Sequence, residues 1–333
     1  METSKLRQTA KIKVRYHARR SLNRIDNEQL RRARGLLKAI KQQRLDVLYL
    51  GDSTTSFVGG DDIDRRQLKT MIGDALGTDV NFYVADGPSF SPDIYDAYLQ
   101  LLRAASQPPL VIVPLCIRVR VAPWIEHPIH GHKRALQALR QVDPFRGPWR
   151  VHAAFRSPNQ AEFDEHRRVP YSTLLGEGIV DDYVSKIHEY GRRGNHDERV
   201  RMLYAYHHGG LLKAGSPEME AVTRMGCTLR ELGAPSVVYQ TPVPIEKAVE
   251  LFGTEMAERT AASFAVLNAA YRLGAGADAH IIECGTSFST DEFIDPRDAS
   301  EHLNETGRRR LTDLIMTQVG AQKGTLRTSS AAP

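Results

Sequence analysis

Five short apolar segments constrain the fold of this chain more than any other feature. They span residues 46–50, 80–85, 110–115, 236–239 and 279–283. Runs of this length and composition are typical of strands buried on both faces. Helical patterns alternate with them, over residues 26–43, 64–76, 93–105, 254–272 and 305–318. This alternation predicts an α/β fold with a parallel sheet covered by helices on both faces.

The alternation breaks between Val121 and Gly233. This stretch of about 110 residues has no strong strand signal, but it has helical patterns over 182–192 and 217–232. We interpret residues 124–234 as a helical insertion, or cap, over the carboxyl edge of the sheet, where open α/β sheets bind ligands.

The predicted domain organisation follows from these boundaries. Residues 1–44 form a basic N-terminal arm and helix. Residues 45–123 and 235–320 form the α/β core, and residues 321–333 form a polar, flexible tail.

Positive charge is concentrated at the N-terminus. Residues 1–44 hold fourteen Lys or Arg and three acids, although the whole chain has a net charge of only +5. Such an arm is suited to an anionic surface or a partner, and a solvated tail followed by an amphipathic helix is the plainer alternative. Tyr16 is the one aromatic residue among these charges, and no DNA-binding motif is present, so we expect no specific nucleic-acid partner.

The remaining composition argues against several classes of protein. Three widely spaced cysteines predict neither a disulfide framework nor a zinc knuckle. No apolar run is long enough to span a bilayer and no secretory signal is evident, so we expect a cytoplasmic protein. No phosphate-binding glycine loop is present. His127, His130 and His132 cluster beside Glu126, but in a Pro- and Gly-containing loop, so we expect no cofactor and no metal.

The segment Gly51-Asp52-Ser53 follows the first apolar run directly. A serine at the end of a buried strand can expose its hydroxyl at the sheet edge, and its own N–H can face a developing oxyanion. Gly51 permits a tight turn there. An ordinary Ser/Thr-rich loop before a helix would show the same letters, so both interpretations stay open for this segment alone.

His302 lies just before the last helical pattern, in the segment Asp298-Ala-Ser-Glu-His302-Leu-Asn304. A histidine there can reach across to a serine at the end of the first strand. A nearby acid can fix its tautomer and stabilise the imidazolium. A surface histidine with Asn304 as helix N-cap is the alternative.

Together the two segments resemble the SGNH/GDSL hydrolase superfamily, over roughly residues 45–123 and 235–318. The resemblance implies a three-layer α/β/α sandwich with a five-stranded, flavodoxin-like sheet. It implies Ser53 as nucleophile and His302 as general base. It also implies Gly87 as an oxyanion donor beside the Ser53 N–H. Members are serine esterases, lipases, thioesterases, carbohydrate deacetylases and some O-acyltransferases.

One departure from the family lies after the third strand. The family has an asparagine oxyanion donor there, and this chain has Cys116, whose thiol is a weak donor. Losing one such donor costs roughly 100- to 1000-fold in rate. Arg118 or Arg120 would replace it or bind an anionic substrate group, and ordinary solvated arginines are the alternative. Asp52, next to Ser53, is a further candidate substrate-binding residue beside Arg118 and Arg120.

A second departure concerns the acid that orients the histidine. The family places an aspartate three residues before it, where this chain has Ala299. Asp298 is the candidate, and Asp295 is the alternative. Glu301 is adjacent to His302 and is expected to point elsewhere. If neither aspartate reaches the ring, a backbone carbonyl would orient it in a Ser–His dyad.

These residues predict a serine esterase that cleaves a small-molecule or glycan ester through an acyl-enzyme. An O-acyltransferase using the same acyl-enzyme is one alternative. A non-catalytic binding protein on a degenerate scaffold of this type is another, supported by the missing asparagine and the irregular acid spacing. In a third, the basic arm is the main feature and tethers the chain to nucleic acid or an anionic membrane.

Overall fold

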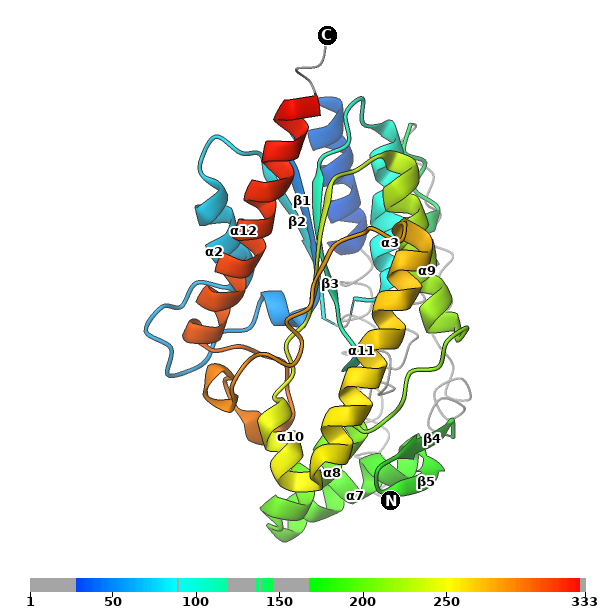
Figure 1. Cartoon of the computed structure of the whole chain (residues 1–333), viewed down its shortest axis with the longest axis vertical. Coiled ribbons are helices and arrows are strands. Elements are labelled where there is room, and N and C mark those ends of the chain that lie inside the picture. Colours follow the sequence, from blue (N-terminus) through cyan, green and yellow to red (C-terminus); the bar gives the residue numbers. More distant parts are fainter. Residues whose placement is uncertain (1–27, 89, 119–135, 138, 146–167, 330–333) are drawn as a thin grey trace, which may run out of the picture.

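The computed structural model describes residues 28–88, 90–118, 136–137, 139–145 and 168–329. Its centre is a parallel five-stranded sheet in the order β2-β1-β3-β6-β7 (Figure 1). The strands are β1 Val47–Gly51, β2 Phe82–Asp86, β3 Leu110–Leu115, β6 Ser236–Gln240 and β7 Ile281–Ile282. The predicted α/β class and five-stranded parallel sheet are therefore confirmed.

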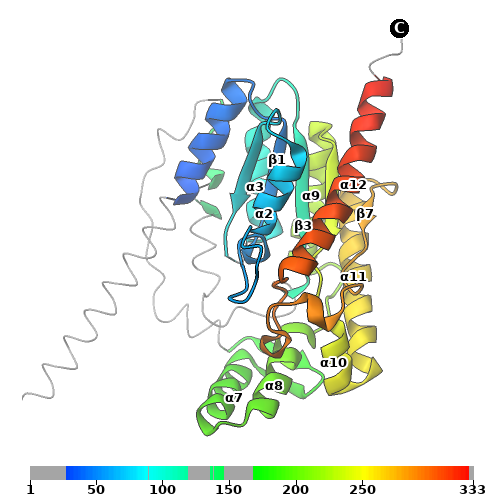
Figure 2. The same ribbon diagram turned by 90° about the vertical axis from the view of Figure 1, so that its left-hand side faces the viewer.

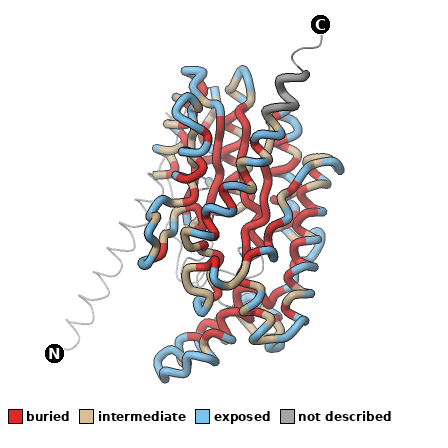
Figure 3. Tube along the Cα trace, turned by 60° about the vertical axis from the view of Figure 1, so that its left-hand side comes forward, coloured by how far each residue is buried: buried red, intermediate tan, exposed pale blue. Residues whose placement is uncertain are grey.

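The inner strands are continuous apolar runs because helices cover both of their faces. Every residue of β1 and β3 is buried, and Figure 3 shows these strands as the buried centre of the molecule. β7 is shorter than the predicted strand over 279–283, because it is an edge strand that pairs with β6 through Ile281 and Ile282 alone.

Successive strand residues face opposite helical layers, as the pleat requires. Val47 and Tyr49 pack in the layer of α2 and α12, whereas Leu48 and Leu50 pack in the other layer. The first layer contains α2 Leu68–Leu76 and α12 Glu305–Ser329. The second contains a helix over residues 28–41 and the helices α3 Pro92–Leu101, α9 Pro217–Leu232 and α11 Thr254–Ala275.

The C-terminal helix is longer than the sequence indicates. α12 continues to Ser329, so residues 321–329, predicted as a flexible tail, are helical. This segment lacks proline, the residue that most strongly ends a helix, and its single Gly324 is tolerated. None of the helices in the described part of the chain is both long and apolar enough to cross a membrane.

The predicted insertion divides into two parts. α7 Val180–Arg193 and α8 His196–His208 lie beyond the carboxyl edge of the sheet, near α10 Ile245–Phe252 (Figures 1 and 2). α9 instead packs on α3 and α11 and belongs to the sandwich, because Met219, Val222 and Met225 join the core there.

The insertion also contains a strand pair that the sequence did not indicate. β4 Pro170–Thr173 and β5 Gly176–Ile179 form an antiparallel hairpin. These strands are short and mostly exposed, so they lack the apolar pattern by which strands are predicted.

Candidate active site

Ser53 begins a short 3-10 helix, Ser53–Thr55, directly after β1. Asp52 caps this turn: its Oδ1 accepts hydrogen bonds from the Thr54 N–H at 2.8 Å and from Thr54 Oγ1 at 2.7 Å. Gly51 is required because a Cβ there would lie 2.5 Å from the Thr55 side chain. Asp52 is only 2% exposed, so the structure gives it a capping role where the sequence suggested substrate binding.

Asp86, at the end of β2, accepts hydrogen bonds from the turn that carries Ser53. Its Oδ2 accepts hydrogen bonds from Ser56 Oγ at 2.6 Å, Thr55 Oγ1 at 3.1 Å and Lys69 Nζ at 2.6 Å. Its Oδ1 accepts from Arg32 at 3.0 Å. Burial favours a higher pKa for Asp86, but the hydrogen bonds from Lys69 and Ser56 and the two cations outweigh it and lower the pKa. Asp86 is therefore ionised, and it fixes the turn to the sheet.

His302 lies on a loop that hydrogen bonds hold on both sides of the residue. The Ile294 N–H donates to the His302 carbonyl at 2.9 Å. Two residues later, Asn304 Oδ1 accepts from the Gly307 N–H at 3.1 Å and so caps α12, a role that the sequence offered only with the alternative of a surface histidine. His302 Nε2 lies 3.3 Å from Ser53 Oγ. The two residues that the sequence pairs across 249 positions thus meet within hydrogen-bond distance.

A buried arginine holds this loop. Arg308 is 0% exposed, although the run 308–310 reads as a solvated helix face. It donates to Asp62 Oδ2 at 2.7 Å, to the Leu303 carbonyl at 2.9 Å and to two backbone carbonyls in the 59–66 loop. The start of α12 is thereby tied to the loop that follows Ser53. The sequence signal for the burial of Arg308 is its position on the same helix face as the buried Leu311 and Ile315, each about one turn from the last.

Phe57 covers one face of the His302 imidazole. The two rings stack with centroids 3.9 Å apart and planes 8° apart. Burial, and secondly the positive charge of Arg118, lower the pKa of His302 to about 3. His302 is therefore neutral at pH 7, which is the form a general base requires.

Neither predicted aspartate contacts the histidine. Asp298 pairs with Arg199 at 3.4 Å, and its side chain is 56% exposed. Asp295 pairs with Arg297 at 3.0 Å. Within the described ranges, no hydrogen bond joins a carboxylate to His302. Between Asp298 and His302 the extra residue, Ala299, takes a left-handed conformation with φ of 52°.

A buried polar cluster lies behind the histidine. The Cys116 thiol donates to Glu301 Oε1 at 3.3 Å, and Arg118 Nη1 donates to Glu301 Oε2 at 3.5 Å. Burial raises the pKa of Glu301 to about 7, against the opposing charge of Arg118. The described hydrogen bonds of the Glu301 side chain go to Cys116 and Arg118, not to the adjacent imidazole, as expected. Its burial beneath the site had no sequence signal, because an acid in a polar loop is normally solvated.

Two of the three predicted oxyanion donors have other partners in this structure. The Cys116 thiol is directed to Glu301. The Gly87 N–H donates to the Gly51 carbonyl at 3.3 Å, which continues the β1–β2 ladder. Gly87 also packs against Phe90, since a Cβ would lie 2.4 Å from that ring. Of the three predicted donors, the Ser53 N–H alone has no acceptor among the described residues.

A cavity of about 730 Å³ opens beside His302, which lines it together with Ser300 but without Ser53, and its size suits a small-molecule ligand. Phe57, Arg118 and His302 line it from the core, and α7 and α8 line it from the insertion. His208 of α8 makes a 3.0 Å hydrogen bond with the Ala299 carbonyl. The insertion therefore contacts the His302 loop and forms one wall of the site.

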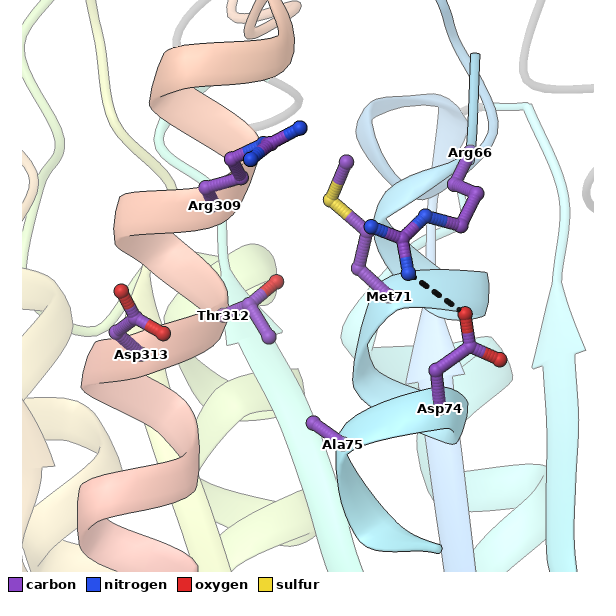
Figure 4. Close-up of a pocket in the computed structure, with 7 residues that line it drawn as sticks. All are labelled: Arg66, Met71, Asp74, Ala75, Arg309, Thr312 and Asp313. Carbon is purple, nitrogen blue, oxygen red and sulfur yellow. Dashed lines mark hydrogen bonds and ion pairs between the residues drawn. The ribbon is translucent and has the colours of Figure 1, made fainter. Parts of the chain in front are cut away.

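A second hollow, of about 480 Å³, lies between α2 and α12 (Figure 4). Its arginines are paired with neighbouring acids: Arg66 with Asp74 at 2.9 Å, and Arg309 with Asp64 at 3.1 Å. It holds no serine or histidine. The cavity that His302 lines is therefore the better candidate for chemistry.

Some predicted features lie outside the described residues. They are Arg120, the cluster Glu126, His127, His130 and His132, and most of the basic arm. Among the residues that are described, no group of three or more His, Cys, Asp or Glu side chains is placed to hold a metal ion.

Two comparisons with known proteins identified no relative of this chain. No protein-family model matches the chain, and no curated protein matches it.

Proposed function

We propose that this protein is a serine hydrolase of the SGNH type that cleaves an acyl ester through an acyl-enzyme on Ser53. The observation that supports this most strongly is the 3.3 Å approach of His302 Nε2 to Ser53 Oγ, at the carboxyl edge of a parallel sheet and beside a cavity. That geometry is the one required of a nucleophile and its base. The substrate is a small-molecule or glycan ester, and the compartment remains the cytoplasm predicted from the sequence.

In the proposed reaction, Ser53 Oγ attacks the ester carbonyl while His302 Nε2 takes the serine proton. The Ser53 N–H faces the oxyanion. The tetrahedral intermediate collapses, His302 gives its proton to the leaving alcohol, and the acyl group stays on Ser53. Water, activated by His302, then attacks the acyl-enzyme and releases the acid.

An acyltransferase would use an acceptor hydroxyl in place of water in the second half. A binding protein is favoured by one specific observation: Cys116 and Gly87, the other two predicted oxyanion donors, are occupied within the protein. Removing one donor typically costs about 100- to 1000-fold in rate.

Release of p-nitrophenol from p-nitrophenyl acetate tests the proposal, with and without glycerol or glucose as acceptor. We expect turnover by the wild type that Ser53→Ala and His302→Ala each abolish. Ser287→Ala is the control, because that hydroxyl donates only to the Cys284 carbonyl. Acetylated acceptor would assign the transferase. Turnover that survives Ser53→Ala would overturn the proposal.

A further inference from the structure

Arginines outnumber aspartates among the residues that line the cavity beside His302. Three arginines, Arg118, Arg192 and Arg199, and two aspartates, Asp295 and Asp298, line it. Both aspartates are paired with arginines: Asp298 with Arg199, and Asp295 with Arg297, which lies outside the lining. The negative charge of the cavity is thus already matched.

Arg118 brings positive charge to the inner end of the cavity. Its side chain is 13% exposed and contacts Glu301 at 3.5 Å. Burial raises the pKa of Glu301 to about 7, and the charge of Arg118 also acts on the buried Asp52. The positive charge of Arg118 also acts on His302, His207 and His208, which places it between the core and α8.

Arg192 brings positive charge to the insertion side. It is exposed on α7, and no acid in the described part of the chain pairs with it. Its neighbour Arg193 differs in both respects: it pairs with Glu189 at 2.8 Å and does not line the cavity. The two arginines therefore form a matched pair for experiment.

We propose that the ester taken by this site carries an anionic group, a carboxylate or a phosphate, which binds Arg118 and Arg192 in the cavity. This inference rests on the proposed ester hydrolysis. Guanidinium groups suit both anions because they donate two parallel hydrogen bonds. A bound anion beside Arg118 would also offset the charge that disfavours the imidazolium form of His302, so it would assist the proton transfer that acylation needs.

Two esters with the same leaving group test the proposal: mono-p-nitrophenyl succinate, which carries a carboxylate, and neutral p-nitrophenyl valerate. We expect kcat/KM to favour the succinate ester by about 100-fold, as for two charge-assisted contacts. Arg192→Gln would reduce this preference about 10-fold, and Arg193→Gln would leave it unchanged. Equal kcat/KM for the two esters, or equal loss in both variants, would overturn the anion site and leave the hydrolase intact.

A binding experiment separates this inference from the proposed chemistry. Calorimetric titration of Ser53→Ala with succinate, glycerol phosphate and uncharged glycerol needs no turnover. Binding of one or both anions, lost in Arg192→Gln and retained in Arg193→Gln, would support the site and show which anion it prefers. Failure of both anions to bind would overturn it, whatever the esters show.

Discussion

The two halves of the candidate site are held in different ways. The serine half is a network of short polar contacts, in which Asp86 joins the turn after β1 to Lys69 and Arg32. The histidine half has no described carboxylate contact, and ring stacking with Phe57 covers the imidazole. The turn that carries the nucleophile is thus held by polar contacts to the sheet, whereas the imidazole ring itself is held by stacking, on a loop that Arg308 anchors. The predictions below test that difference.

The largest expected effect is on the serine half. Asp86→Asn leaves Lys69 and Arg32 without their shared anion, and we expect it to lower the free energy of unfolding by about 3 kcal/mol at pH 7. Because the folded-state pKa of Asp86 lies below its unfolded value of 3.8, this stabilisation is present above pH 3.8 and is lost as pH falls further. Urea unfolding of the wild type and of Asp86→Asn at pH 7 and at pH 3 measures the loss of stability and its dependence on pH. An unchanged urea-unfolding midpoint at pH 7 would show that Asp86 does not stabilise the fold.

The pH profile tests the histidine half. The base acts in its neutral form, so activity is present above the pKa of His302, which is about 3, and is lost as pH falls through it. A histidine of ordinary pKa would lose about 97% of its neutral form by pH 5. We expect kcat/KM for p-nitrophenyl valerate to be nearly level between pH 7 and pH 5. An acid limb near pH 6.5 would show that the base is not held neutral in this way.

Removing the stacking partner should have a moderate effect. We expect Phe57→Leu to lower kcat by about 5-fold, since an aromatic pair contributes about 1 kcal/mol beyond its buried area. Phe57→Tyr keeps the ring and should recover most of the activity. If the tyrosine variant is as slow as the leucine variant, stacking does not position the base.

The smallest effect is predicted for the aspartate that the sequence favours. Asp298 makes a half-exposed ion pair with Arg199, so Asp298→Asn should change stability by less than about 0.5 kcal/mol. We expect kcat to change by less than about 3-fold, because the carboxylate does not contact His302. A loss of kcat comparable to that of His302→Ala would contradict this and would assign Asp298 to the imidazole.

The sequence predicts what depends on periodicity and chain order. The buried strands, the serine at the end of β1 and the histidine before α12 all follow from local patterns, and the sheet brings them together. The occupied Gly87 N–H does not follow, because the ladder register that uses it is a tertiary feature. Arg308 has a weak signal in its helical spacing from Leu311 and Ile315, whereas Glu301 is an acid in a polar loop that only three-dimensional packing buries.

Helix assignment shows the same limit. The pattern over 217–232 predicts α9 correctly, but not the layer to which it belongs, because an amphipathic stripe does not reveal its partner. Choosing the acid by its spacing from His302 meets the same limit. Counting residues finds Asp298 near His302, yet the left-handed conformation of Ala299 lies between them and the side chain meets Arg199 instead.

The most direct test of the account is the intact mass of the protein after treatment with a fluorophosphonate. We predict one adduct on the wild type, none on Ser53→Ala, and strongly slowed labelling of His302→Ala, with Ser287→Ala labelled as the wild type. Folded wild-type protein that takes no adduct, or an adduct that persists in Ser53→Ala, would contradict the activated serine and favour a binding protein.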